Sequence, residues 1–163
     1  MWTAVTVLCT LAAVATTVAA VAVMTSPPAH ATEFACPDER SAGAVTGSGP
    51  GGTDSGPNTI LGFQHAYYVT RSAEQAKRFL TPEFGSGVIG ELLQPGIDAV
   101  APDTRHCVRM PVLDTDIDTG SVRWQVDLTE HHPGADPATV VFTQTVTTRT
   151  HDGVSLISDI APA

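Results

Sequence analysis

The sequence predicts an α+β domain in which two to three N-terminal helices pack on a four-stranded, curved antiparallel meander with a cone-like shape. Two observations predict this class. Apolar residues recur at helical spacing from residue 58 to residue 93, and after residue 102 the spacing changes to the alternation that is typical of strands. Helices that are followed by a run of strands indicate an α+β rather than an α/β fold.

The helices are expected in the first half of this domain. The first begins at Asn58, whose side chain is suited to an N-cap. Ser72 caps the second helix, which ends before Pro82 because the residue that precedes a proline disfavours helix. A short third helix covers residues 88–93 and is ended by Pro95.

Four strands are expected after the helices. They cover residues 105–112, 121–130, 139–150 and 154–160. The second of these strands shows the two-residue period most clearly, since Trp124, Val126 and Leu128 alternate with polar residues. Asp152 and Gly153 lie between the third and fourth strands and form a typical hairpin turn.

Two segments precede this domain, which spans residues 58–163. Residues 1–31 are expected to be a signal peptide or a transmembrane anchor, and residues 32–57 a strap containing Cys36 and then a linker. The part from residue 41 to residue 57 is rich in Gly, Ser and Pro and has too few apolar side chains to offset the entropy of ordering. It is therefore predicted to be flexible.

The first segment determines the predicted location of the protein. Residues 2–24 carry no charge, and ~20 apolar residues suffice to cross the hydrocarbon core of a bilayer. Ala29-His30-Ala31 fits the small-x-small pattern that precedes a signal-peptidase site. The length of the apolar run and the lack of a preceding Lys or Arg favour a retained anchor or a start upstream. Both fates stay open, and both place residues 32–163 outside the cytoplasm, secreted or anchored to the membrane.

The charge of the chain excludes one class of partner. The chain has 8 Lys and Arg against 17 Asp and Glu, a formal net charge of −9, and all of these residues follow residue 31. Such a surface repels nucleic acid. The expected partners are the membrane, through the N-terminal segment, and an envelope protein or a small apolar ligand. No cofactor is indicated.

Two cysteines lie outside the apolar segment, Cys36 and Cys107. In an oxidising compartment such a pair is most simply a disulfide, which would close a loop of about 70 residues and stabilise the domain by roughly 4 kcal/mol. The alternative is a catalytic thiol at Cys107 that is activated by His106. Adjacent residues on a strand point to opposite faces, so the disulfide is the preferred interpretation.

Two clusters resemble metal sites without the required spacing. Within residues 114–120 a carboxylate occurs at every second position up to Asp118, as in a calcium-binding loop. An EF-hand, however, needs Gly at the sixth position of its loop, and this chain has Thr119 there. His131, His132 and His151 match no zinc-ligand spacing. Both clusters are therefore interpreted as exposed turns, and no metal site is predicted.

A candidate pocket is expected between the first helix and the sheet. Its residues are His65, Tyr68 and Arg71 from the helix, His106 from the first strand and Gln144 from the third. Such a group could hold a small ligand or transfer protons. No carboxylate is evident among these residues to act as a general base, which weakens the catalytic interpretation.

Three segments resemble a family of exported actinobacterial proteins of unknown function. They are residues 66–72 (AYYVTRS), 96–107 (GIDAVAPDTRHC) and 144–148 (QTVTT), and the resemblance extends over residues 58–161. It implies export and an envelope location but no activity and no catalytic residues. More loosely, helices followed by a curved meander resemble the nuclear-transport-factor-2-like or cystatin-like cone, a superfamily that includes isomerases, dehydratases and non-catalytic modules.

These observations lead to one preferred function and two alternatives. The preferred one is a non-enzymatic envelope module that binds a small molecule or a partner protein at the mouth of the helix–sheet cleft. The first alternative is a small cone-fold enzyme, an isomerase or hydrolase, with His65 or His106 as base and Tyr68 as acid. The second is a structural subunit of a membrane complex, anchored by residues 2–24.

Overall fold

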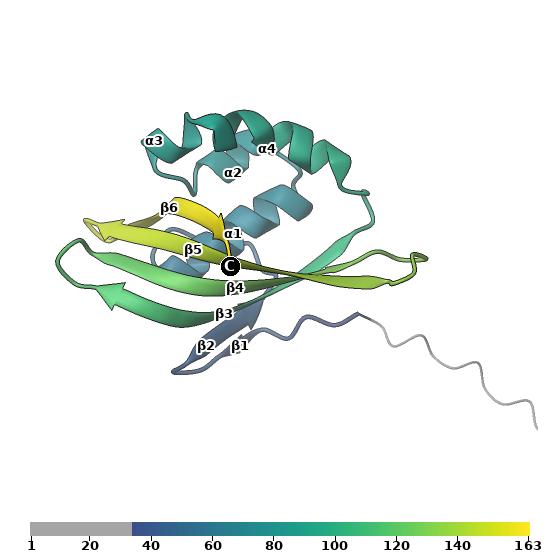
Figure 1. Ribbon diagram of the computed structural model, residues 1–163, viewed down its shortest axis with the longest axis horizontal. Coiled ribbons are helices and arrows are strands. Elements are labelled where there is room, and N and C mark those ends of the chain that lie inside the picture. Colours follow the sequence, from purple (N-terminus) through teal and green to yellow (C-terminus); the bar gives the residue numbers. More distant parts are fainter. Residues whose placement is uncertain (1–33) are drawn as a thin grey trace, which may run out of the picture. The chain divides into compact units, whose positions relative to one another are not determined.

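The computed structural model describes residues 34–163, in which six antiparallel strands form one sheet in the order of the sequence (Figure 1). The strands are β1 (Glu39–Arg40), β2 (Ala44–Gly47), β3 (Arg105–Asp116), β4 (Ser121–His131), β5 (Thr139–His151) and β6 (Val154–Pro162). Four helices lie between β2 and β3 in the sequence: α1 (Gly56–Tyr68), α2 (Ala73–Lys77), α3 (Pro82–Gly85) and α4 (Val88–Ala99). The signal or anchor segment predicted for residues 1–31 lies outside the described residues.

The predicted fold class is wrong in its sheet and in its helices. The sheet has six strands instead of four, and the helices do not come first in the described chain because β1 and β2 precede them. The four strands that the alternation predicted are present, with β3 extending further, to Asp116. No helix within residues 34–163 is long and apolar enough to cross a membrane.

Of the two additional strands, β2 lies in the segment predicted to be flexible, residues 41–57, and β1 lies directly before that segment. Residues 44–47 pair with residues 108–111 of β3, and β1 pairs with β2. The composition of this segment provides few apolar contacts, so its order comes from backbone hydrogen bonds to the edge of a formed sheet. Cys36, three residues before the start of β1, is bonded to Cys107 of β3 with 5.3 Å between the Cα atoms. The predicted disulfide is confirmed, and it holds this segment against the strand with which it pairs.

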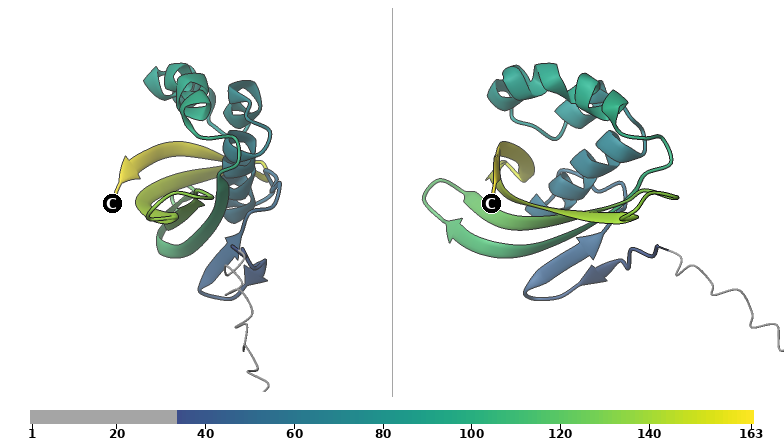
Figure 2. Two further views of the ribbon diagram at one scale, coloured as in Figure 1. Left: turned by 90° about the vertical axis from the view of Figure 1, so that its right-hand side faces the viewer. Right: turned by 45° about the vertical axis from the view of Figure 1, so that its right-hand side comes forward.

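The helices form a second layer on one face of the sheet (Figure 2). α1 lies across the strands, and its buried residues include Ile60, Leu61 and Phe63. α4 does not end before Pro95, as predicted, but continues to Ala99. A proline inside a helix removes one hydrogen bond, and burial of Leu93 and Ile97 on either side of it offsets that loss.

Candidate functional site

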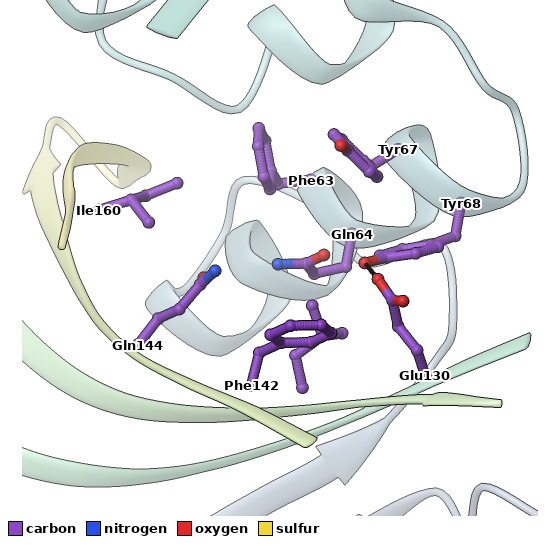
Figure 3. Close-up of a pocket in the computed structure, with 9 residues that line it drawn as sticks. Phe63, Gln64, Tyr67, Tyr68, Glu130, Phe142, Gln144 and Ile160 are labelled. Atoms are coloured by element: carbon purple, nitrogen blue, oxygen red, sulfur yellow. Dashed lines mark hydrogen bonds between the residues drawn. The ribbon is translucent and has the colours of Figure 1, made fainter. Parts of the chain in front are cut away.

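A cavity of about 300 Å³ lies between α1 and the face of the sheet that α1 covers (Figure 3). Its lining residues are Phe63, Gln64, Tyr67 and Tyr68 of α1, Leu128 and Glu130 of β4, Phe142 and Gln144 of β5, and Ile160 of β6. Most of these side chains are apolar or aromatic. Glu130 is the one carboxylate among them, and no Lys or Arg lines the cavity.

Both carboxylate oxygens of Glu130 have hydrogen-bond partners. The Tyr68 hydroxyl donates to Oε1, as the dashed line in Figure 3 shows. Oε2 lies 2.9 Å from His132 Nε2, and the other ring nitrogen of His132 lies 3.1 Å from Thr104 Oγ1. A buried carboxylate requires such partners, because burial of an unpaired charge is costly. Hydrogen bonds and close polar contacts therefore connect Tyr68, in the cavity wall, through Glu130 to His132, whose side chain is partly exposed, and on to Thr104.

Alternation along β4 accounts for the position of Glu130. Trp124, Val126 and Leu128 are buried on the inner face of the sheet. Glu130 follows two residues after Leu128, so its side chain lies on the same face, and only 9% of it is exposed. The Cα partner of Glu130 on β3 is His106. No carboxylate was evident near the candidate pocket from the sequence, yet the two-residue period of the predicted strand 121–130 places Glu130 on the same face as Leu128.

The two tyrosines of α1 are held in their neutral forms. Burial raises the pKa of Tyr68 far above its ordinary value, and the hydrogen bond to Glu130 raises it further. The pKa of Tyr67 is also raised, first by burial and then by the negative charge of Glu130. Tyr68 is therefore a hydrogen-bond donor to Glu130 throughout the physiological range.

His106 is buried beside Tyr68. Its ring stacks on that of Tyr68 with 4.7 Å between the centroids and 19° between the planes. The side chain is 5% exposed, and its buried Nε2 has no hydrogen-bond partner within the described part of the chain. Burial and, to a smaller extent, the nearby charge of His65 together lower the pKa of His106 to about 4. His106 is thus a neutral ring at neutral pH.

The depressed pKa of His106 predicts a loss of stability in acid. The folded-state value of about 4 lies below the ordinary value of 6.5, so between these two pH values the unfolded chain binds the proton more tightly. The contribution of His106 is complete above about pH 7 and decreases by up to roughly 3 kcal/mol as the pH falls through 4. Urea unfolding followed by circular dichroism at pH 7 and pH 4.5 measures this loss.

The variant His106→Phe keeps the ring stack and removes both the titration and the unpartnered nitrogen. We expect it to be at least as stable as the wild type at pH 7 and to lose less stability between pH 7 and pH 4.5. His151→Gln is the matched control, because the His151 side chain is 93% exposed; this variant should lose as much stability between pH 7 and pH 4.5 as the wild type. Equal acid losses in the wild type and in His106→Phe would contradict the prediction.

The five residues of the predicted pocket do not all meet. Tyr68 and Gln144 line the cavity, and His106 adjoins it through its stack on Tyr68. The guanidinium of Arg71 instead donates to the carbonyls of Ile97 and Val100, at the end of α4. His65 is half-buried in the last turn of α1 and is not among the residues that line the cavity.

The two clusters that resembled metal sites have other roles. Asp116 accepts hydrogen bonds from the backbone N–H groups of Asp118 and Thr119, as a turn residue does. His131 stacks on Phe34, whereas His132 binds Glu130. Within residues 34–163 no three His, Cys, Asp or Glu side chains are grouped so that they could hold a metal ion.

Comparison with known families gives a match over nearly all of the folded part. A family described as a domain of unknown function, DUF8176, matches residues 33–161. The chain belongs to this family. The DUF8176 match begins just before the first described residue and includes β1 to β5, all four described helices, and β6 except for its last residue, Pro162.

No curated protein matches the chain, and no solved structure matches it. The DUF8176 match agrees with the expected membership of an uncharacterised family. The actinobacterial signature and the relation to the nuclear-transport-factor-2-like cone stay predictions.

Proposed function

We propose that residues 34–163 form an extracytoplasmic module that binds a small molecule in the cavity between α1 and the sheet. The observation that carries the proposal is the composition of the cavity, which is open to solvent, has a volume of about 300 Å³ and is lined mostly by apolar and aromatic residues. Gln64, Gln144 and Glu130 add a few polar groups to those walls. Small-molecule sites commonly have this composition and a volume of roughly 300–1,000 Å³.

The proposed location depends on two features at the N-terminal side of the domain. The disulfide between Cys36 and Cys107 is of a kind that persists in oxidising compartments. The uncharged residues 2–24 would direct export and, where retained, tether the module to the membrane. In this proposal the module binds its small-molecule ligand outside the cytoplasm. An envelope protein is the alternative to a small-molecule ligand.

The hydrogen bond between Tyr68 and Glu130 favours a second candidate, an acid–base enzyme of the isomerase or hydrolase type. Glu130 supplies the carboxylate that the catalytic hypothesis lacked. Two features favour binding over catalysis. Tyr68 is a poor acid because its pKa is raised, and both oxygens of Glu130 already have partners. Proton abstraction by Glu130 would require one of these contacts to break.

A cavity-filling variant tests the binding proposal. The full-length protein in lipid nanodiscs is screened by saturation-transfer NMR against a fragment library in which each carbon skeleton occurs as an amine, an alcohol and a carboxylate. We expect some fragments to bind, and Gln144→Phe to abolish their binding because the larger side chain occupies the cavity.

Thr143→Phe is the matched control, since residues 143 and 144 point to opposite faces of β5. It adds the same side chain outside the cavity, so fragment binding should persist. A library without binders, or binders retained by Gln144→Phe, would refute the binding proposal. Chemical conversion of a bound fragment that is lost in Glu130→Gln would establish the enzyme instead.

A further inference from the structure

The charge of the cavity is concentrated in one carboxylate. Glu130 comes from the inner face of β4 and is 9% exposed, and no cationic side chain lines the same space. Its contact with Tyr68 leaves its charge uncompensated, because the Tyr68 hydroxyl is a neutral donor. A carboxylate has about four lone-pair positions, so its two existing partners leave acceptor capacity unused.

His132 contacts the Glu130 carboxylate but is not among the residues that line the cavity. Its Nε2 lies 2.9 Å from Glu130 Oε2, and the ring is about one-third exposed, with 29% of its side chain accessible. The other ring nitrogen, Nδ1, lies 3.1 Å from Thr104 Oγ1, so the ring is held at both of its nitrogens. His132 therefore orients the carboxylate from outside the cavity, and the described residues that form the cavity walls include no Lys or Arg.

The aromatic side chains of the cavity walls favour a positively charged ligand. Phe63, Tyr67 and Phe142 present aromatic rings around the cavity (Figure 3). The face of an aromatic ring attracts a cation through its quadrupole, and this attraction increases when water is excluded. The carboxylate and the aromatic rings thus favour a positive charge, whereas an anionic ligand would meet Glu130 without a compensating cation.

We propose that the cavity binds a small organic cation, with an ammonium group held by Glu130 and an apolar portion packed against the aromatic walls. The proposal rests on the small-molecule binding proposed above and names the class of ligand. The formal net charge of −9 supports it further, because an acidic surface increases the local concentration of cations. Phe142 is 45% exposed and lines the cavity, so the site is accessible from solvent.

The matched fragments of the same library test the ligand class. Within each skeleton that binds, the amine should bind at least about tenfold more tightly than the alcohol and the carboxylate, as expected for one added charge-assisted contact. In Glu130→Gln this ratio should fall to about one. Glu91→Gln removes the same charge from the exposed surface of α4 and should keep the ratio.

The outcomes separate the two proposals. An alcohol that binds as tightly as its amine, or an amine preference retained by Glu130→Gln, would overturn the cation assignment and leave the binding proposal intact. A library without binders would overturn both. Where Glu130→Gln does not fold, the amine-to-alcohol ratio of the wild type decides alone, with nuclear Overhauser contacts between the amine-bearing methylene and the Glu130 side chain as the second measurement.

Discussion

Gly51→Ala is expected to destabilise the domain by about 3 kcal/mol or more, although Gly51 lies in a segment that composition predicted to be flexible. Gly51 has φ = +60°, in the left-handed region that an alanine adopts only with strain. An added Cβ would lie 2.1 Å from the carbonyl oxygen of Asn58 and 2.3 Å from the amide nitrogen of Gly62. Both are backbone atoms of α1, so the helix itself would have to move.

Functional loss should accompany this destabilisation, because α1 carries four of the residues that line the cavity, Phe63, Gln64, Tyr67 and Tyr68. Urea unfolding followed by circular dichroism measures the change in the free energy of unfolding. Gly49→Ala is the matched control, since Gly49 has no atom within 4 Å of an added Cβ. It should change stability by no more than about 0.5 kcal/mol. Equal stabilities of the two variants would show that residues 49–52 do not pack on α1.

Loss of the Cys36–Cys107 disulfide is expected to have an effect of similar size. The two cysteines are separated by 71 residues in the sequence, and a cross-link over such a loop stabilises by about 4 kcal/mol, chiefly by restricting the unfolded chain. A domain of this size has a total stability of roughly 5–15 kcal/mol. The double variant Cys36→Ser, Cys107→Ser should therefore be close to the limit of folding.

The measurement compares urea unfolding of the wild type with and without reductant. Reduction should lower the wild-type stability to that of the double variant, whereas the double variant should not respond to reductant. Edge pairing of β1 and β2 should be lost first, because Cys36 lies three residues before the start of β1. A wild type that is unaffected by reductant, or two free thiols in its non-reduced peptide map, would contradict this account.

The strands were predictable because their signal is local. Alternation from Ser121 to Glu130 predicted β4 almost to its end, since the side-chain period of two is encoded in adjacent residues. The disulfide was equally accessible, because Cys36 and Cys107 are the one cysteine pair outside the apolar segment. Ser72 caps α2 as expected, with its side chain accepting from the backbone of Gln75.

Other features depended on contacts between distant residues. β2 forms because β3 offers an unpaired edge, a property of the assembled sheet that the Gly- and Ser-rich composition of residues 41–57 does not indicate. α4 continues through Pro95 because Leu93 and Ile97 are buried against the rest of the domain. Local propensity was outweighed in both cases by tertiary contacts.

The candidate site shows the same division. The sequence by itself determined the uncharged N-terminal segment, the acidic charge, the disulfide partners and the inner and outer faces of the strands, because each is a property of composition or of neighbouring residues. Only the tertiary structure decided that Tyr68 meets Glu130 across 62 positions of sequence and that Arg71 binds the end of α4 instead of the cavity. The physical reason is that burial and hydrogen-bond partners arise between elements, so a polar residue acquires its role only when the chain has folded around it.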